Sequence, residues 1–183
     1  MRKIIGIAVI TICALFFCRV ASGQPNLKLV FLRHAEKPYD GDNLNCQGLN
    51  RSLLLSKMLK DKFGIPSAIF VPSLGQGQVT RHSRMLETIS PFAVKYNLPI
   101  NSNYAENDGV AIAKDLKSRQ GTVIIVWQHS SIPKILRALG VNVPGLHWPD
   151  NDFDGIWIVT FKNGVPILTI DREKLKPSKD CPF

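Results

Sequence analysis

Two histidines and two arginines are the residues of this sequence best suited to chemistry. His34 and His129 each come just after a short apolar run, and Arg33 directly precedes the first of them. Imidazole is a nucleophile that is largely neutral near pH 7, and a guanidinium group binds phosphate oxygens in pairs and keeps its charge. Together with Arg84, these side chains could hold and transfer a phosphoryl group, a reaction that requires mainly positioning and charge stabilisation.

The apolar runs before the two histidines predict buried strands. Leu27–Leu32 is rich in β-formers, and Thr122–Trp127 contains five consecutive β-branched residues, a pattern typical of a central strand in a parallel sheet. Ligands of such sheets bind outside the carboxyl ends of the strands. We therefore expect His34 and His129, although 95 positions apart, to project into one crevice. Arg84 should face it from the start of a helix.

The rest of the chain alternates between helical and strand periods, which favours a single α/β domain. Helices are expected over 46–63, 81–96 with a kink at Pro91, 110–118, and from Ser131 to before Gly140. Further strands are expected over 68–71, near Ile100, 155–161 and 165–170. The last helix should add free N–H groups to the phosphate site. Residues 76–78 are expected to form a loop, and the polar tail after Asp171 should be loose.

Four segments in order along the chain resemble the motifs of one family. Phe31–Pro38 resembles the Arg-His-Gly/Ala signature of the histidine phosphatase (phosphoglycerate mutase-like) superfamily, here followed by Glu-Lys-Pro. Leu44–Gly48 is similar to its Leu-Thr-x-x-Gly helix start, with Asn45 in place of Thr. Arg84–Thr88 resembles its Arg-x-x-x-Thr segment, and Gln128-His129 resembles its second histidine after a strand. The resemblance runs from residue 27 to about 140 and implies a three-layer αβα sandwich with a mostly parallel central sheet and a C-terminal β-hairpin.

The resemblance also implies roles for individual residues. His34 would be the phosphorylated nucleophile, and Arg33, Arg84 and His129 would form the phosphate pocket. Further substrate contacts are expected from three residues: Lys37, Asn45 and Ser130. The branch of acid phosphatases and phytases has an Asp directly after the second histidine, and this chain departs from it. The other branch has a Glu between the arginine helix and the second histidine, for which Glu106 is the best fit and Asp108 the next. No metal and no cofactor is expected.

Several other motifs have weaker functional interpretations. Arg81-His82 is a second Arg-His pair, but it follows a Gly-rich loop, so we expect surface residues at a helix start. The alternative is that Arg81 lies at the rim of the phosphate pocket. His147 and Trp148 could pack at the edge of the core or form a lid. Asp150–Gly155 imitates the start of an EF-hand calcium loop, but the twelfth position, where that loop needs a Glu, is a Phe in a predicted strand. We assign no role to the segments Trp148-Pro149-Asp150 and Phe153-Asp154.

The N-terminus has the features of a secretory signal peptide over residues 1–23. Arg2 and Lys3 precede an uncharged run, Ile4–Phe17, which is short for a membrane span, and Ala21–Gly23 offers small residues for cleavage. An uncleaved anchor is the alternative. Cleavage would leave a domain of residues 24–183 and remove three basic residues and no acidic ones, lowering the net charge from +9 to +6. Scattered positive charge with no basic stripe excludes nucleic acid as an expected partner and suits anionic substrates.

Two cysteines remain in the mature domain, Cys46 and Cys181. Export would permit a disulfide between them, and two cysteines allow only one pairing. The sequence leaves open whether they meet.

These features predict an exported, metal-independent hydrolase of small phosphate monoesters, periplasmic or secreted, with no stable membrane insertion after cleavage. Two alternatives keep the same fold: a non-catalytic protein that binds phosphate or another anion, and a phosphoglycerate mutase-like phosphotransferase. Export argues against the mutase, whose substrates are cytoplasmic, and favours phosphates of cell-envelope glycans or lipids. A metal site using both histidines is a further rival, although no i,i+4 His pair or nearby Cys supports it.

Overall fold

The computed structural model describes residues 26–75 and 80–183 of the 183-residue chain. The predicted signal peptide and the loop predicted over 76–78 lie outside these residues, so both stay predictions. None of the helices in the described ranges is both long enough and apolar enough to cross a membrane.

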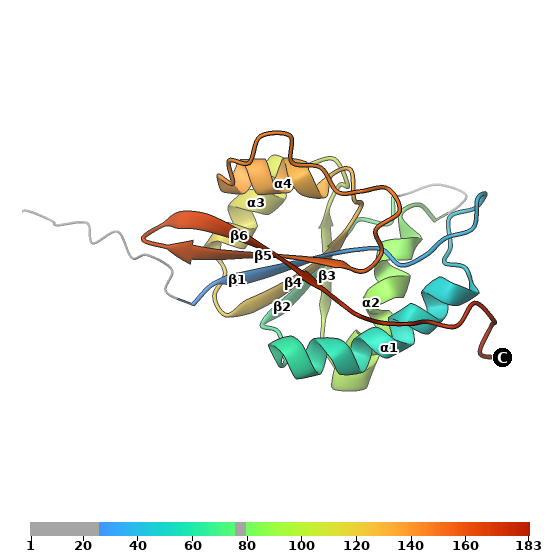
Figure 1. Cartoon of the computed structure of the whole chain (residues 1–183). Coiled ribbons are helices and arrows are strands. Elements are labelled where there is room, and N and C mark those ends of the chain that lie inside the picture. The colour runs from blue at the N-terminus through green and yellow to red at the C-terminus, as the bar shows by residue number, and fades with distance from the viewer. Residues whose placement is uncertain (1–25, 76–79) are drawn as a thin grey trace, which may run out of the picture.

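A mixed sheet of six strands lies at the centre of the described domain (Figure 1). In spatial order the strands are β3 (Ile100–Tyr104), β2 (Ala68–Pro72), β4 (Thr122–Trp127), β1 (Lys28–Arg33), β5 (Gly155–Lys162) and β6 (Val165–Arg172). The first four are parallel, and the antiparallel hairpin β5–β6 joins the sheet beside β1. The predicted mostly parallel sheet with a C-terminal hairpin is therefore confirmed. The two strands that precede the histidines are neighbours in its middle.

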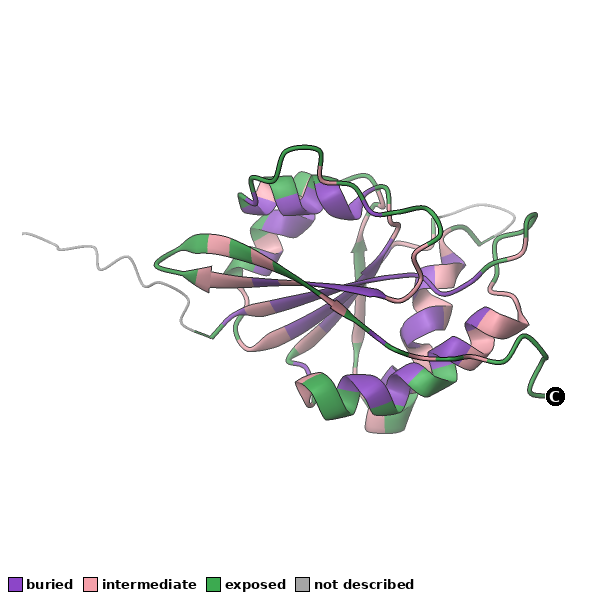
Figure 2. Cartoon of the chain, viewed as in Figure 1, coloured by how far each residue is buried: buried purple, intermediate pink, exposed green. Residues whose placement is uncertain are grey.

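Four helices in the same ranges cover the two faces of the sheet: α1 (Cys46–Phe63), α2 (Ser83–Tyr96), α3 (Gly109–Ser118) and α4 (Ile132–Leu139). Helices α1 and α2 lie on one face, and α3 and α4 on the other (Figure 1). Leu29 and Phe31 of β1 pack on the α3 and α4 side, and Val30 and Leu32 on the α1 and α2 side, because successive side chains of a strand point to opposite faces. Burial is concentrated in the sheet and on the helix sides that face it (Figure 2). The fold is the expected three-layer αβα sandwich.

The start of α1 is fixed against the loop that follows β1. Asn45 caps the helix, because its Oδ1 accepts from the backbone N–H of Gly48 at 2.9 Å. The backbone N–H of Asn45 donates to the carbonyl of Glu36 at 3.0 Å. A Cβ at position 48 would lie 2.1 Å from that same carbonyl oxygen, so the helix reaches this close only because Gly48 has no side chain. Helix α1 thereby holds the loop that begins with His34.

The start of α4 differs from the expectation. Ser131 occupies the N-cap position, but its side chain makes no capping bond and its hydroxyl donates to Glu106 Oε1. The backbone N–H groups of Ser131 and Ile132 donate to the carbonyl of Gln128 at 2.9 and 3.1 Å. These first N–H groups are therefore used within the turn itself, which corrects the expectation that α4 offers them to a phosphate.

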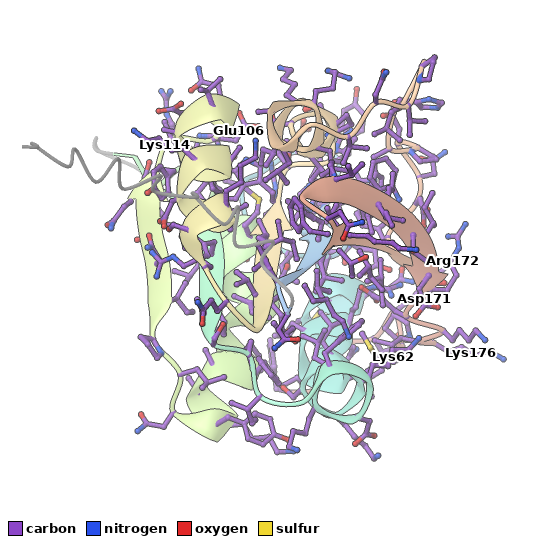
Figure 3. The ribbon with its side chains drawn as sticks, turned by 90° about the vertical axis from the view of Figure 1, so that its left-hand side faces the viewer. Lys62, Glu106, Lys114, Asp171, Arg172 and Lys176 are labelled. Atoms are coloured by element: carbon purple, nitrogen blue, oxygen red, sulfur yellow. A yellow bond between two sulfur atoms is a disulfide. The ribbon has the colours of Figure 1, made fainter. Side chains whose placement is uncertain are left out.

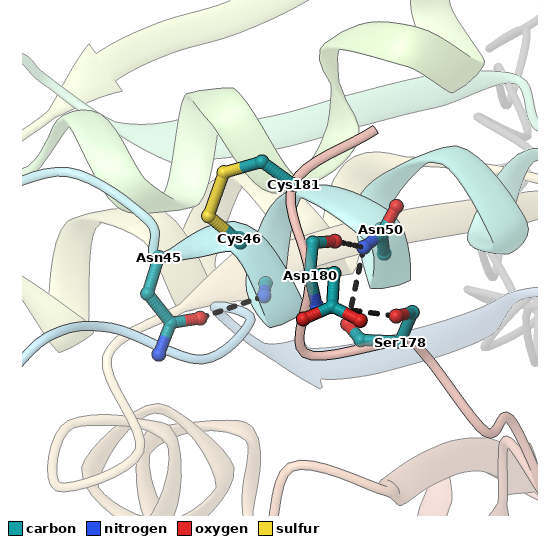
Figure 4. Close-up of a disulfide and its surroundings, with 7 residues drawn as sticks. Asn45, Cys46, Asn50, Ser178, Asp180 and Cys181 are labelled. Atoms are coloured by element: carbon teal, nitrogen blue, oxygen red, sulfur yellow. Dashed lines mark hydrogen bonds between the residues drawn. A yellow bond between two sulfur atoms is a disulfide. The ribbon is translucent and has the colours of Figure 1, made fainter. Parts of the chain in front are cut away.

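The tail after β6 packs against α1, which corrects the expectation of a loose tail. Asn50 Nδ2 donates to the carbonyl oxygens of Ser178 at 3.0 Å and Asp180 at 2.6 Å. Cys181 forms a disulfide with Cys46, the first residue of α1 (Figure 4). The question that the sequence left open is thus answered: the two cysteines meet, although 135 positions separate them.

Two ion pairs join the end of β6 and the start of the tail to α1. Lys62 Nζ donates to Asp171 Oδ2 at 2.6 Å (Figure 3). Arg51 Nη1 donates to Glu173 Oε2 at 2.5 Å, and the Glu173 side chain is only 2% exposed. A polar composition predicted solvation for this tail, but the fold supplies a buried cation as the partner of Glu173.

Candidate active site

The carboxyl ends of β1 and β4 bring the two histidines to one edge of the sheet. Arg33 at the end of β1 is in parallel register with Trp127 at the end of β4. The backbone N–H of His34 donates to the carbonyl of Trp127 at 3.3 Å, and His129 comes two residues after β4. The two imidazoles are close enough for the charge of a protonated His129 to lower the pKa of His34. Parallel topology alone accounts for this meeting.

His34 is held as a neutral imidazole. It is 1% exposed, and its Nδ1 lies 2.7 Å from the carbonyl oxygen of Ala35. A carbonyl only accepts, so Nδ1 carries the proton and Nε2 keeps its lone pair. Burial, with smaller effects from the charges of Arg33 and Arg84, lowers the pKa of His34 to about 3. A neutral ring with a free lone pair on Nε2 is the form that can attack phosphorus.

Arg33 is buried beside His34 and held by the loop before β5. Its Nη1 donates to the carbonyl of Asp150, and its guanidinium carbon lies 3.9 Å from the centroid of the Phe153 ring. The same ring meets His34 edge-on, with ring centroids 6.0 Å apart. Burial lowers the pKa of Arg33 to about 10, against the raising effect of Asp150, so the guanidinium stays charged at neutral pH. Phe153 thus contacts both the candidate nucleophile and a candidate phosphate-binding cation.

Arg84 lies in the first turn of α2, which begins at Ser83 rather than at the predicted Arg81. Its Nη1 donates to the carbonyl of Gly41 at 3.0 Å and lies 3.8 Å from Asp42 Oδ1. Its side chain is 14% exposed. The contacts with residues 41 and 42 fix the guanidinium near the end of β1, where its charge lowers the pKa of His34.

Thr88 ties α2 to the loop that carries His34. Its Oγ1 accepts from the backbone N–H of Ala35 at 2.9 Å and donates to the carbonyl of Arg84 at 2.7 Å. The side chain is fully buried. One hydroxyl therefore couples the position of His34 to the turn that carries Arg84. The sequence marked Thr88 only as part of a motif and predicted no role for it.

His129 is partly buried and oriented by Asp150. Its Nε2 lies 3.1 Å from Asp150 Oδ1, and a carboxylate accepts, so Nε2 carries a proton. Burial and the charge of Arg33 lower the pKa of His129, while Asp150 and Glu106 raise it. A bound phosphate dianion would also raise this pKa. Binding would then favour a doubly protonated His129 that donates its Nδ1–H to the anion.

Across the residues that the structure describes, four buried side-chain nitrogen or oxygen atoms have no hydrogen-bond partner: Arg33 Nε, His34 Nε2, Arg84 Nε and His129 Nδ1. Buried polar groups in folded proteins are nearly always paired, since each unpaired group costs about 1–3 kcal/mol. All four atoms belong to residues that the sequence grouped as a phosphate site. The cluster therefore has the donors to bind an oxyanion beside the lone pair of His34.

The two candidate proton donors lie in different settings. Glu106 lies beside α3 and α4 (Figure 3), and its Oε1 accepts from the hydroxyl of Ser131. It is near enough to His129 to raise the pKa of that ring. Asp108 is exposed and caps α3, since its Oδ1 accepts from the backbone N–H of Ala111 at 3.1 Å. Of the two, Glu106 is the carboxylate associated with the histidine cluster.

Three residues expected to contact substrate have different surroundings. Lys37 is exposed, and its Nζ donates to two carbonyls of its own loop at 3.2 and 3.5 Å. Asn45 donates from Nδ2 to the carbonyl of Lys37 at 3.2 Å while its Oδ1 caps α1, and its expected contact with substrate stays a prediction. Ser130 is exposed directly after His129. Of the three, only Ser130 adjoins the cluster in sequence.

The remaining histidines and the second Arg-His pair make no hydrogen bond or ion pair with the cluster in the described residues. Arg81 is exposed, and His82 precedes α2 in the left-handed region at φ 60°, as a helix-start residue. His147 is exposed, with Nδ1 3.1 Å from the carbonyl oxygen of Gly145. Over residues 26–75 and 80–183, no three His, Cys, Asp or Glu side chains are grouped so as to hold a metal ion.

Residues 148–154 form one wall of the site, a role that the sequence did not predict. Asp150 contacts Arg33 through its carbonyl and His129 through its carboxylate, and Phe153 packs on Arg33. Trp148 is 3% exposed, donates to the carbonyl of Asp152 at 2.8 Å and stacks on Trp157 at 4.6 Å between ring centroids. Trp148 is therefore a core residue that anchors the loop. The crowding of aromatic and acidic residues was the only signal available in the sequence.

No protein-family model matches this chain, and no curated protein sequence matches it. Solved structures do match. The protein histidine phosphatase SixA complexed with tungstate is 17% identical with a TM-score of 0.58, and the match covers 80% of this chain and 97% of that chain. A phosphoserine phosphatase from Entamoeba histolytica in complex with 3-phosphoglyceric acid is 14% identical with a TM-score of 0.57, covering 78% and 94%.

The α-ribazole phosphatase of Shigella flexneri matches over 85% of this chain and 98% of its own, with a TM-score of 0.52 and 10% identity. These structures share an architecture with this chain over nearly their whole length, at identities too low to carry over a substrate. The motifs in the sequence and the solved structures agree on one conclusion: this chain has the fold of the histidine phosphatase superfamily, a fold that hosts phosphatases.

Proposed function

We propose that this protein is an exported phosphatase that hydrolyses small phosphate monoesters through a phosphohistidine at His34, without a metal ion. One observation carries the proposal: the buried polar atoms left without partners in the described residues come from His34, Arg33, Arg84 and His129 alone. A set of two guanidinium groups, two imidazoles and one free ring lone pair matches the needs of phosphoryl transfer.

In the first step His34 Nε2 attacks phosphorus and forms a P–N bond, while the bond from phosphorus to the ester oxygen breaks. The ester oxygen leaves with the electron pair and takes a proton to become an alcohol. In the second step water attacks phosphorus and gives a proton back to the group that protonated the alcohol, the P–N bond breaks, and phosphate leaves with His34 neutral again. The low pKa of His34, set by burial, keeps the ring unprotonated and ready to attack throughout the neutral pH range.

Arg33 and Arg84 supply two positive charges, which match the two negative charges of a phosphate monoester. Their unpaired Nε–H groups can each donate to a phosphate oxygen. His129 would add a third donor once the anion raises its pKa. Fixed donors of this kind stabilise the charge of the transferring group without needing to reorganise, which is a large term in enzymatic catalysis.

Glu106 is the proposed proton donor to the leaving oxygen. Its association with His129 and the hydroxyl of Ser131 supports this choice over Asp108, whose carboxylate caps α3. Glu106→Gln should lower kcat strongly for alkyl phosphates and less for p-nitrophenyl phosphate, whose leaving group needs no proton. Equal loss with both substrates would contradict the assignment.

The test of the proposed reaction is hydrolysis of p-nitrophenyl phosphate by the purified protein, in EDTA, with vanadate as inhibitor. We expect activity that survives EDTA and is lost in His34→Ala, while His147→Ala, an exposed histidine elsewhere, serves as the matched control. Loss of activity in EDTA that a divalent ion restores would overturn the metal-independent mechanism. Vanadate or tungstate binding without turnover of any phosphomonoester would instead identify an anion-binding protein, and transfer to a second substrate in place of water would identify a phosphotransferase.

Export is proposed from the signal-peptide pattern over residues 1–23 and is supported by the Cys46–Cys181 disulfide, since disulfides persist in oxidising compartments. The mature protein should begin at Gln24. N-terminal sequencing of exported material tests this, and an intact Met1 in a membrane fraction would favour an anchor.

A further inference from the structure

A buried cluster of ionisable side chains, formed by Arg51, Glu36 and Glu173, adjoins the candidate site and takes no part in the chemistry proposed above. The guanidinium of Arg51 in α1 donates from Nε and Nη2 to the two carboxylate oxygens of Glu36, at 2.9 and 2.7 Å. From Nη1 it donates to Glu173 at 2.5 Å. The three side chains are 7%, 11% and 2% exposed. Planar, bidentate pairs of this kind fix orientation as well as distance.

The cluster reaches the nucleophile through Glu36. Glu36 follows Ala35, whose carbonyl accepts the Nδ1–H of His34 at 2.7 Å and so orients the ring. The carbonyl of Glu36 accepts from Asn45 at 3.0 Å, and its carboxylate is held by Arg51. A shift of this carboxylate would therefore move the peptide that sets the direction of the Nε2 lone pair.

The same cluster reaches the opposite wall through the tail. The backbone N–H groups of Glu173 and Lys174 donate to the carbonyl and carboxylate of Asp154, each at 2.8 Å. Asp154 Oδ1 also lies 4.0 Å from Arg51 Nη1. Asp154 directly follows Phe153, the ring that packs on Arg33 and His34. Arg51 thus lies between the two loops that carry the walls of the site.

The far end of the tail is secured to the same helix. Asn50 holds the carbonyls of Ser178 and Asp180, and Cys181 is bonded to Cys46 in the first turn of α1 (Figure 4). The stretch 173–181 is therefore attached at both ends, by Arg51 at Glu173 and by a disulfide at Cys181. We call this stretch the strap.

We propose that Arg51 is a positioning residue for phosphoryl transfer, and that the strap, closed by the Cys46–Cys181 disulfide, holds the His34 loop and the Phe153 loop in register through it. The inference rests on the proposed function, because these loops form the walls of that site. It predicts a full catalytic rate only while the strap is closed.

The first test compares Arg51→Met and Arg51→Lys with Lys57→Met, which breaks an exposed ion pair with Asp61 on the same helix. Displacement of reacting groups by about 1 Å costs about 100-fold in rate, so Arg51→Met should lower kcat for p-nitrophenyl phosphate about 100-fold. KM should change far less, because Arg33 and Arg84 remain. Arg51→Lys should recover part of the rate, since it keeps the positive charge but not the planar guanidinium that pairs with both carboxylate oxygens of Glu36. Lys57→Met should match the wild type.

The rate is counted per folded site, with the folded fraction of each variant taken from urea unfolding under the assay conditions, so that a merely less stable protein is recognised. An unchanged kcat per folded site in Arg51→Met would overturn the positioning role. A wild type that neither hydrolyses nor becomes labelled would instead refute the proposed function. In that case the positioning role in phosphoryl transfer is refuted together with the function, whereas an unchanged kcat in Arg51→Met beside an active wild type overturns the positioning role alone.

The second test opens the strap without touching a charge. A dithiol such as dithiothreitol gives two electrons and two protons to the disulfide, yielding two thiols and its own cyclic disulfide. Reduction should lower kcat about 10-fold, a typical coupling between distant groups, and reoxidation should restore it. The Cys46→Ser/Cys181→Ser variant should have the same kcat as the reduced wild type, and the dithiol should not change it. A folded, reduced enzyme with the full oxidised rate would overturn the role of the strap.

Discussion

Two groups of ionisable side chains adjoin the His34 loop, and they are built in opposite ways. Around Arg51, the Nε, Nη1 and Nη2 atoms each have a carboxylate partner. At the ends of β1 and β4, Arg33 and His34 each retain an atom without a partner, and so do Arg84 and His129.

This difference in hydrogen-bond pairing distinguishes a cluster that positions neighbouring segments from a cluster that binds a ligand. A buried charge whose partners are all present holds neighbouring segments together, and removing one partner leaves another charge unpaired. Buried donors without partners cost stability and are kept where a ligand completes them. The paired cluster thus has the composition of a support, and the unpaired cluster that of a binding site.

The largest effect is expected at His34 and His129. His34→Ala should lower turnover by at least about 10⁴-fold, because a nucleophile and its stabilising groups act as a unit. His129→Ala should lower turnover less, and the double variant should be no slower than His34→Ala alone. Rapid quenching with labelled substrate should reveal an acid-labile, base-stable adduct in the wild type and in His129→Ala. An adduct on His82 or His129, with activity intact, would refute the assignment of His34.

The next largest effect concerns stability and contrasts the two clusters directly. Arg51→Met leaves the buried carboxyl groups of Glu36 and Glu173 without their shared partner and should lower the free energy of unfolding by about 3–5 kcal/mol. Arg33→Met removes a charge that lacks full pairing and should cost less than about 1 kcal/mol or stabilise the protein, while activity is lost. Urea unfolding of the oxidised proteins measures both values. Equal destabilisation by the two changes would contradict the contrast.

A smaller effect distinguishes the arginines of α2. Arg84→Ala should remove one charge-assisted contact with phosphate, worth about 2–4 kcal/mol in the transition state, or about 30- to 1000-fold in kcat/KM. Arg81→Ala should change kcat/KM little, because Arg81 is exposed at the helix start. Steady-state kinetics on p-nitrophenyl phosphate compare the two. Greater damage from Arg81→Ala would mean that the wrong arginine has been assigned.

The effect that is smallest per pH unit is a pH dependence within the paired cluster. Burial raises the pKa of Glu173 from 4.5 to about 8, although the charge of Arg51 opposes this. The folded state therefore holds this proton more tightly than the unfolded chain. The resulting stability is complete below the unfolded pKa and is lost as the pH rises through about 8.

Across that window one proton contributes a slope of at most about 1.4 kcal/mol per pH unit. Glu173→Gln should flatten the decline of unfolding free energy between those two pKa values. Glu87→Gln, a change in a carboxylate outside the cluster, is the control. Urea unfolding at several pH values provides the measurement, and an unchanged slope in Glu173→Gln would show that this carboxyl does not titrate there.

Features set by neighbours in the chain could be predicted from the sequence. The β-branched run of β4 and the capping amide of Asn45 produced the elements they predicted, to within a few residues at their ends. The sequence predicted that His34 and His129 lie close together, because parallel strands place their carboxyl ends at one edge of the sheet. The expected capping of α4 by Ser131 was wrong, because the hydroxyl of Ser131 donates to Glu106 and not to its own helix.

Pairings between distant segments were decided only by the tertiary structure. Nothing in the spacing of Asp150 and Phe153 indicates that they close over Arg33, and nothing in the polar tail indicates that Glu173 is buried against Arg51. Periodicity and capping are local, because they depend on atoms a few residues apart. Which carboxylate meets which guanidinium depends on the order β3-β2-β4-β1-β5-β6, and that order follows from packing the whole sheet between its two helix layers.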